Sequence, residues 1–197
     1  IMKKLIILGT LFIGLLSFTS LHIDSYNIDV EKSNVKWIGS KITGSSHEGN
    51  ISFLDGKIKM DHGKLIAADF TIDMNSITNT DIESASSSKK LIKHLKNEDF
   101  FDVENFPKAS FKLIRATQNT DGSYQVVGEL SIKKFKDVIN FKMNATTKGD
   151  SFFADGKFTF DRTKFDVIYG SGTFFDNLGD RAINNEVEMS FNITSTK

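Results

Sequence analysis

The chain has no cysteine and only one proline, Pro107. Without cysteine there is no disulfide framework, so burial of apolar side chains and hydrogen bonds between strands must hold the fold together. A lipid anchor attached through an N-terminal cysteine is excluded for the same reason. With 197 residues, 39% of them hydrophobic, the chain is long enough to build such a core as one domain.

The chain also lacks an excess of charge. Its 25 basic and 25 acidic residues balance, which argues against a nucleic-acid partner and against a polybasic membrane-binding surface. Tryptophan and tyrosine are scarce, with 1 and 3 residues, whereas there are 18 phenylalanines. The aromatic side chains therefore carry few hydroxyl or indole N–H groups and are suited to an apolar interior.

The most apolar run, residues 5–16, is about twelve residues long, too short to cross a bilayer of about 30 Å as a helix. It follows Lys3 and Lys4 and precedes small residues at 17–20, a pattern typical of a cleaved export signal. We expect a signal peptide over residues 1–20 and a mature domain over residues 21–197, located in the periplasm or secreted. A permanent membrane anchor is the alternative interpretation.

Apolar and polar residues alternate along most of the remaining chain, which predicts β-strands. The first two are expected over residues 26–30 and around Val35 and Trp37, and Asp55-Gly56 is expected to form a hairpin turn. We count about eight strands joined mostly by short turns and predict an all-β, eight-stranded antiparallel barrel, with a sandwich as the alternative. Gly39, Gly128 and Gly156 fall inside strand patterns, where we expect bends or bulges.

One helix interrupts this pattern near residues 88–97. Leu91, Ile92 and Leu95 lie on one helical face, and lysines occupy the other. Phe100 and Phe101 follow the helix before Pro107 returns the chain to an extended conformation. The helix is therefore expected to act as a lid or plug at the end of the sheet.

Residues typical of catalysis or metal binding are sparse. The four histidines, His22, His47, His62 and His94, have no ligand spacing, and no serine lies in a nucleophile motif. The paired carboxylates flank turns, where aspartate commonly caps N–H groups. We expect no catalytic residue, metal or cofactor. An exported enzyme that uses carboxylates within residues 161–180 stays open as an alternative.

The inward face of the predicted strands is apolar and rich in phenylalanine: Phe53, Phe70, Phe111, Phe141, Phe158 and Phe160. Leu130 shares this strand pattern. Each such side chain contributes roughly 1.5–3 kcal/mol when buried. Periodicity cannot distinguish a hollow barrel from one filled by its own side chains, so an interaction module with a solid core is a third reading.

The stretch KLIKHLKNEDFFDVENFPKASF resembles the signature of the YceI-like family, and FTIDMNSITNTD and DRTKFDVIYGSGTFFDNLGD are similar to further parts of it. The resemblance implies a lipocalin-like barrel that holds a polyisoprenoid or fatty-acid-like amphiphile. We expect no nucleic-acid partner, as the balanced charge indicates, a role for the membrane only as a source of lipid, and a possible homodimer. The ligand-binding residues expected in the lumen are Trp37, Phe53, Phe70, Ile72, Phe111, Leu130, Phe141, Phe158 and Phe160. Those expected near its mouths are Phe100, Phe101, Phe174 and Phe175.

Overall fold

The computed structural model describes residues 23–197, so the expected signal peptide lies outside the described residues. The strands are β1 (Ile23–Ile28), β2 (Asn34–Ser40), β3 (Ser46–Asp61), β4 (Lys64–Asp73), β5 (Lys108–Gln118), β6 (Tyr124–Ile132), β7 (Phe135–Lys148), β8 (Ser151–Asp161) and β9 (Glu186–Thr196). The helices are α1 (Ala85–Lys96) and the 3-10 turns η1 (Met74–Ser76), η2 (Arg162–Phe165) and η3 (Gly179–Arg181). No helix within residues 23–197 is both long and apolar enough to cross a membrane.

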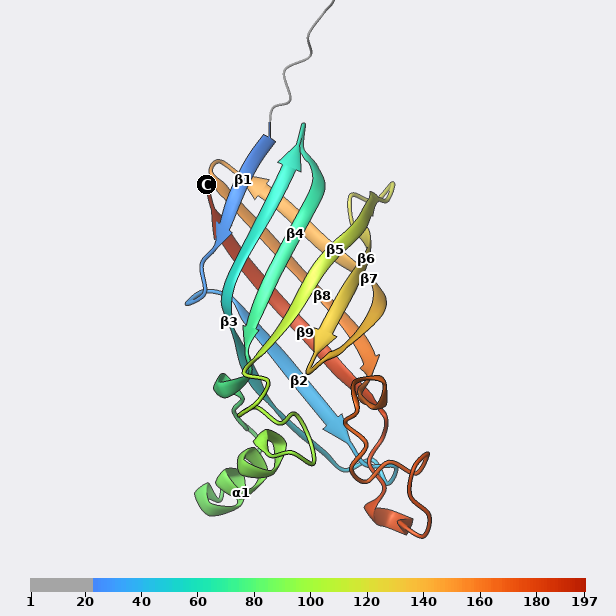
Figure 1. Cartoon of the computed structure of the whole chain (residues 1–197). Coiled ribbons are helices and arrows are strands. Elements are labelled where there is room, and N and C mark those ends of the chain that lie inside the picture. Colours follow the sequence, from blue (N-terminus) through green and yellow to red (C-terminus); the bar gives the residue numbers. More distant parts are fainter. Residues whose placement is uncertain (1–22) are drawn as a thin grey trace, which may run out of the picture.

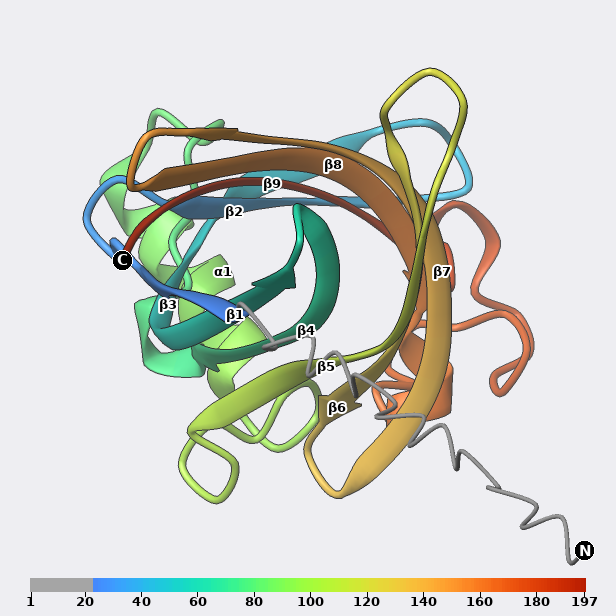
Figure 2. The same ribbon diagram turned by 90° about the horizontal axis from the view of Figure 1, so that it is seen from above.

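The strands form one closed antiparallel sheet (Figures 1 and 2). β1 and β2 both pair with β3 on one side and with β9 on the other. They therefore share one position in the ring, one after the other along the barrel. The ring therefore has eight positions, and the prediction of an eight-stranded antiparallel barrel with one helix is confirmed. Closure pairs each strand position with a neighbour on both sides over at least part of its length, which limits the edge that could recruit another strand.

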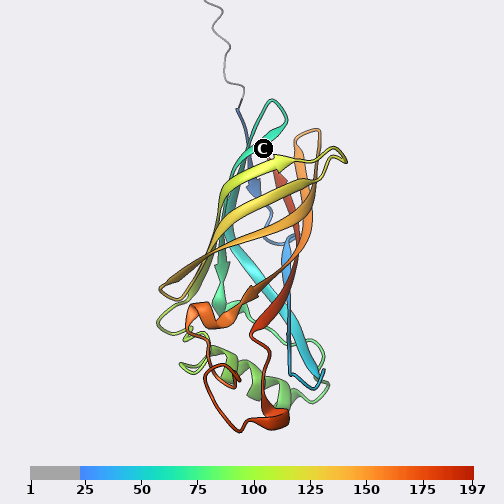
Figure 3. The same ribbon diagram turned by 90° about the vertical axis from the view of Figure 1, so that its right-hand side faces the viewer.

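Side chains along the strands alternate between the inner and the outer face of the sheet, which suits a sheet that closes around an apolar interior. The side chains of β6 alternate between buried and more exposed positions along its whole length, as expected for a sheet with one face toward a core and one toward solvent. Tight turns join the strands at the upper end in Figure 1, including His62-Gly63, where both residues have positive φ. The lower end instead carries two long segments, residues 74–107 and 162–185 (Figure 3).

Two strand predictions are wrong in detail. Asp55-Gly56 is not a turn, because β3 runs through it and shows only a β-bulge, marked by a register shift between Phe53 and Asp55. Neither residue has the positive φ that a tight hairpin needs. The first strand ends at Ile28, so Val30 lies outside it and is exposed.

The predicted helix is present, and it begins three residues before the expected start. The side chain of Ser84 accepts a hydrogen bond from the N–H of Ser87 and so caps the first turn. The serines that follow read as loop in the sequence, but they belong to the helix. None of its residues is fully buried, so α1 lies over the lower end of the barrel as a cover.

Candidate functional site

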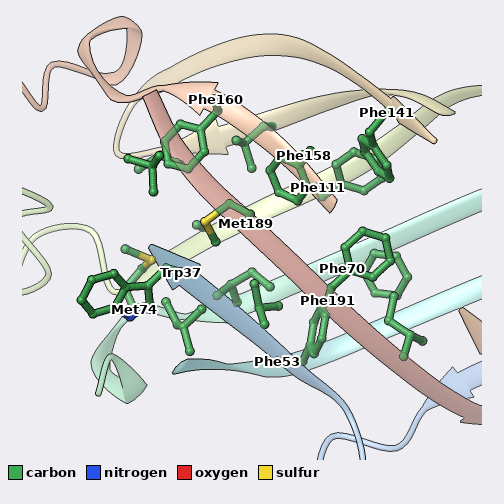
Figure 4. Close-up of a pocket in the computed structure, with 18 of the residues that line it drawn as sticks. Trp37, Phe53, Phe70, Met74, Phe111, Phe141, Phe158, Phe160, Met189 and Phe191 are labelled. Atoms are coloured by element: carbon green, nitrogen blue, oxygen red, sulfur yellow. The ribbon is translucent and has the colours of Figure 1, made fainter. Parts of the chain in front are cut away.

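The barrel encloses a cavity that offers about 200 Å³ to the centres of water-sized groups. Side chains from strands all around the ring and from both long segments line it, and Figure 4 shows many of them converging on the open space. Eleven of the residues expected to bind ligand lie in this lining: Trp37, Phe53, Phe70, Ile72, Phe100, Phe101, Phe111, Leu130, Phe141, Phe158 and Phe160. Whether they contact a ligand stays a prediction.

Phe174 and Phe175 do not line the cavity. They lie in segment 162–185 and are largely exposed, with 53% and 45% of their surfaces accessible. Outside the regular strands the period-2 pattern stops. There, the presence of a phenylalanine does not by itself tell whether the position lines the cavity or lies at the surface.

A row of phenyl rings crosses the cavity wall from strand to strand. It runs through Phe70, Phe111, Phe141, Phe158 and Phe191, and successive ring centroids lie 5.3–6.4 Å apart. These separations suit favourable contacts between aromatic rings. The row gives the middle of the lumen a continuous aromatic surface.

Glycines make room for this row. β6 lies between β5 and β7 but contributes Gly128, and a methyl group built at Gly128 would overlap the ring of Phe111. A methyl group built at Gly156 would come within 2.7 Å of the Phe191 ring. Two of the three strand glycines noted in the sequence are therefore packing positions. Gly39 has no atom near such a methyl group.

Polar groups are nearly absent from the lining. Of its residues only Arg162 and Asn184 carry a polar side chain other than the indole of Trp37, whose Nε1 donates to the carbonyl of Thr78 at 3.2 Å. No carboxylate belongs to the lining. Within residues 23–197, no group of three histidine or carboxylate side chains could hold a metal ion.

Arg162 is buried, with 2% of its surface exposed. Its guanidinium donates to the carbonyls of Asn184 at 3.0 Å, Val167 at 2.6 Å, Tyr169 at 2.9 Å and Ile183 at 3.2 Å. Burial lowers the pKa of Arg162 from its usual value. The carbonyls satisfy most of its donors, so this side chain organises segment 162–185 at the lower end of the cavity.

Aromatic contacts join the two lower segments. The ring centroid of His94, in α1, lies 4.5 Å from that of Tyr169, and the Phe100 centroid lies 5.4 Å from Tyr169. Leu95, Phe100 and Phe101 from the same region line the cavity. This lower cluster of His94, Phe100 and Tyr169 connects the α1 region to segment 162–185 across the lower end.

Sequence reasoning missed several lining residues, notably Met74, Met189 and Phe191. Each shares the inward parity of residues that were identified, so the signal was present in the alternation. Arg162 was missed because charged residues are rarely buried. The sequence around it also gives no sign of its four carbonyl partners.

The fold and cavity define a class: closed antiparallel barrels with an apolar lumen. The sequence pattern of the YceI-like domain matches residues 26–195, and the chain belongs to the YceI-like family. A relative from Shewanella denitrificans, described only as a UPF0312 protein, is 25% identical over 150 residues, which cover 75% of this chain and 76% of the relative.

Solved structures share the fold. BcnA from Burkholderia cenocepacia superimposes with a TM-score of 0.69 at 24% identity, covering 86% of this chain and 99% of BcnA. A domain from Saccharophagus degradans, described as polyisoprenoid binding, gives a TM-score of 0.62 at 14% identity, covering 87% of this chain and 97% of that domain. At these identities the similarity establishes the fold alone.

Proposed function

We propose that this protein binds the apolar tail of a single long-chain amphiphile, a polyisoprenoid or a fatty-acid-like molecule, in the barrel lumen without transforming it. The observation that carries the proposal is the almost wholly apolar cavity ringed by phenylalanines (Figure 4). Such a cavity offers water few hydrogen-bond partners and favours an apolar guest.

The cavity dimensions support one extended chain. An eleven-residue strand such as β8 spans roughly 37 Å at about 3.4 Å per residue, so the barrel wall is long enough to enclose an extended chain. The cavity volume of about 200 Å³ suits one chain better than several. Each methylene buried there contributes about 0.8 kcal/mol, offset in part by the cost of ordering the chain.

The ligand class is supported by the Saccharophagus degradans domain, which is described as polyisoprenoid binding. Binding without turnover is supported by the absence of carboxylates from the lining. Asp102 instead accepts hydrogen bonds from Asn105, and Asp161 caps Thr163. Both carboxylates act in local turns.

We also propose export, with residues 1–20 as the signal peptide. The basic start, the short apolar run and the small residues after it support this assignment. N-terminal sequencing of the protein from fractionated cells tests it. We expect a mature N-terminus near Leu21 in the periplasm or medium, and an uncut N-terminus in the cytoplasm would contradict it.

Mass spectrometry of the gently purified protein, followed by analysis of its organic extract, tests the ligand proposal. We expect one bound molecule per chain with a long hydrocarbon or isoprenoid tail. The delipidated protein should then bind all-trans-retinol, a fluorescent isoprenoid alcohol, in a 1:1 ratio. A folded protein with an empty extract and no retinol binding would refute the proposal.

A matched pair of variants places the binding. Met189→Trp puts a larger side chain into the lumen, whereas Ile66→Trp enlarges a side chain that is 48% exposed outside the cavity lining. We expect Met189→Trp to weaken retinol binding about tenfold or more, by excluding part of the tail, and Ile66→Trp to leave it unchanged. Equal effects would argue against a lumen site.

A further inference from the structure

Within the described residues, the strand ladder around the barrel is incomplete at two places. Residues 64–68 of β4 and 113–118 of β5 share no ladder pair, and a second separation lies between β7 and β8. β7 and β8 pair from Lys148 and Ser151 down to Met143 and Gly156. Below that pair β7 continues to Phe135, bonded only to β6, and β8 continues to Asp161, bonded only to β9. In the described chain no ladder pair joins residues 135–142 to residues 157–161. We call the space between these two edges the β7–β8 slot.

The slot has defined limits. Its upper limit is the last ladder pair, Met143 and Gly156. Its lower limit is an exposed ion pair in which Lys164 Nζ lies 2.9 Å from Asp137 Oδ2. An exposed ion pair of this kind is weak compared with a continuous strand ladder, so it constrains the two edges of the slot only weakly.

Two phenylalanines fill the slot from inside. Phe141 of β7 and Phe158 of β8 stack with ring centroids 5.3 Å apart and lie side by side in Figure 4. Their contact involves no hydrogen bond, so a change of side-chain rotamer in either ring can open it. The backbone of the barrel need not change for this to happen.

Outside the slot lies a cleft of about 1150 Å³. The cleft and the lumen share Phe141, Phe158, Ile183, Asn184 and Met189 in their linings. Single side chains therefore separate the outer cleft from the inner cavity at this place.

The outer cleft differs from the lumen in chemistry. Asn140, Thr159, Asn184 and Asn185 supply neutral hydrogen-bonding groups, and the two lysines of the lining are matched by two glutamates. Such a surface suits an uncharged polar group, such as a hydroxyl or an amide. The apolar lumen suits only the tail.

Side-chain contacts also close the two ends of the barrel. At the upper end, Tyr26 and Phe152 are almost fully buried, with ring centroids 5.8 Å apart. At the lower end, the lower cluster of His94, Phe100 and Tyr169 joins the two long segments. A guest that entered by either end would have to separate these groups.

We propose that the outer cleft binds the uncharged polar end of the amphiphile and that its tail enters the lumen through the β7–β8 slot, between Phe141 and Phe158. This inference rests on the proposed function and adds the route and the chemistry of the polar end. It assigns Phe141 and Phe158 the role of a gate.

Locking the slot tests the route. The chain has no native cysteine, so Asn140→Cys with Thr159→Cys, joined by a short bis-maleimide, bridges the two outward-facing edges without competing reactions. The control joins Asn144→Cys and Asp155→Cys, a pair already opposed in the ladder, with the same reagent. Uptake and release of all-trans-retinol by each delipidated protein are followed by stopped-flow fluorescence.

We expect the bridge across the slot to slow both uptake and release about tenfold or more, as for a closed lid, while the control bridge changes neither rate. Equal rates for the two bridged proteins would overturn the slot as the route. If the unmodified protein binds no retinol and its extract is empty, the proposed function itself fails. The two failures are therefore distinguishable.

Photolabelling tests the position of the polar end. A fatty amide with a diazirine beside the amide is expected to label peptides containing residues 140, 157–159 and 182–190, whereas a diazirine at the far end of the tail should label Phe53 and Phe70 in the lumen. Labelling of Leu95 or Phe100 by the first probe would place the polar end at the bottom of the barrel and overturn the assignment.

Discussion

The two ends of this barrel are built from the same residue types but differ in packing. At the upper end, Tyr26, Ile58 and Phe152 expose only 1–2% of their surfaces. In the lower half, the inward-facing Trp37, Phe158 and Met189 are only partly buried and border the cavity. The cavity lining therefore runs from fully buried side chains such as Ile58 and Phe152 at one end to partly buried ones at the other.

The difference shows that alternation determines which way a side chain faces and leaves undetermined whether it meets a partner. Phe152 and Phe158 lie on the same face of β8, six residues apart. Phe152 packs against Tyr26. Its paired residue on the adjacent strand β9 is Ser195, which is fully buried. Phe158 borders the β7–β8 slot, where β7 no longer pairs with β8.

Replacing each of these two phenylalanines by alanine gives the largest expected contrast. Phe152→Ala should lower the free energy of unfolding by about 3–5 kcal/mol, because a fully buried ring that packs against Tyr26 is removed. Phe158→Ala should cost less than half as much in the ligand-free protein, since its ring is already partly unpacked. Urea denaturation of the delipidated proteins measures both values.

The two variants should rank in the opposite order when the rate of ligand release is measured. Phe158→Ala removes one side of the gate and should speed retinol release, whereas Phe152→Ala should leave the release rate close to that of the unmodified protein. Equal losses of stability in the two variants would mean that the lower half is as tightly packed as the upper end.

Glycine substitutions sharpen the contrast on a smaller scale. Gly128→Ala places a methyl group against the Phe111 ring, so we expect a loss of about 1–3 kcal/mol from overpacking. Gly39→Ala has open space around it and should be neutral or slightly stabilising. Thermal unfolding of the two variants compares them, and similar values would show that Phe111 can move aside freely.

The smallest effect is expected at Asp81, which fastens segment 74–107 to β3. Partial burial opposes ionisation of this carboxyl, but the N–H of Glu48 and the ring of His47 outweigh it and lower the pKa of Asp81 to about 2. Because the folded-state pKa is depressed, the stabilisation is present above about pH 4 and is lost as the pH falls toward 2.

Asp81→Asn should therefore reduce stability by about 1 kcal/mol near neutral pH, and the difference from the unmodified protein should vanish near pH 2. Urea titrations at several pH values measure this trend. A difference independent of pH would mean that the charge of Asp81 is unimportant for fastening the segment.

The barrel could be predicted from the sequence because each strand carries its own period-2 pattern and the helix its own periodicity. The residue-level errors came from local signals that tertiary contacts overrode. Asp55-Gly56 has turn chemistry, yet it lies in a bulge because the neighbouring strands pair on both sides of it. Arg162 gave no signal, because its carbonyl partners come from segment 162–185, which has no regular pattern.

The distinction between hollow and solid could not be predicted for a different reason. It depends on how inward side chains from all the strands meet one another, and alternation within one strand does not report this. The β7–β8 ladder, for example, stops at Met143 and Gly156, although both strands keep their alternation beyond that point. No residue in either strand marks the separation.

The ring is closed by β9, the last strand of the chain, which pairs with both β1 and β2 at the beginning. These contacts join residues at opposite ends of the sequence, and such distant contacts make the search for the native state slow. The barrel therefore cannot close until β9 is available to pair with β1 and β2.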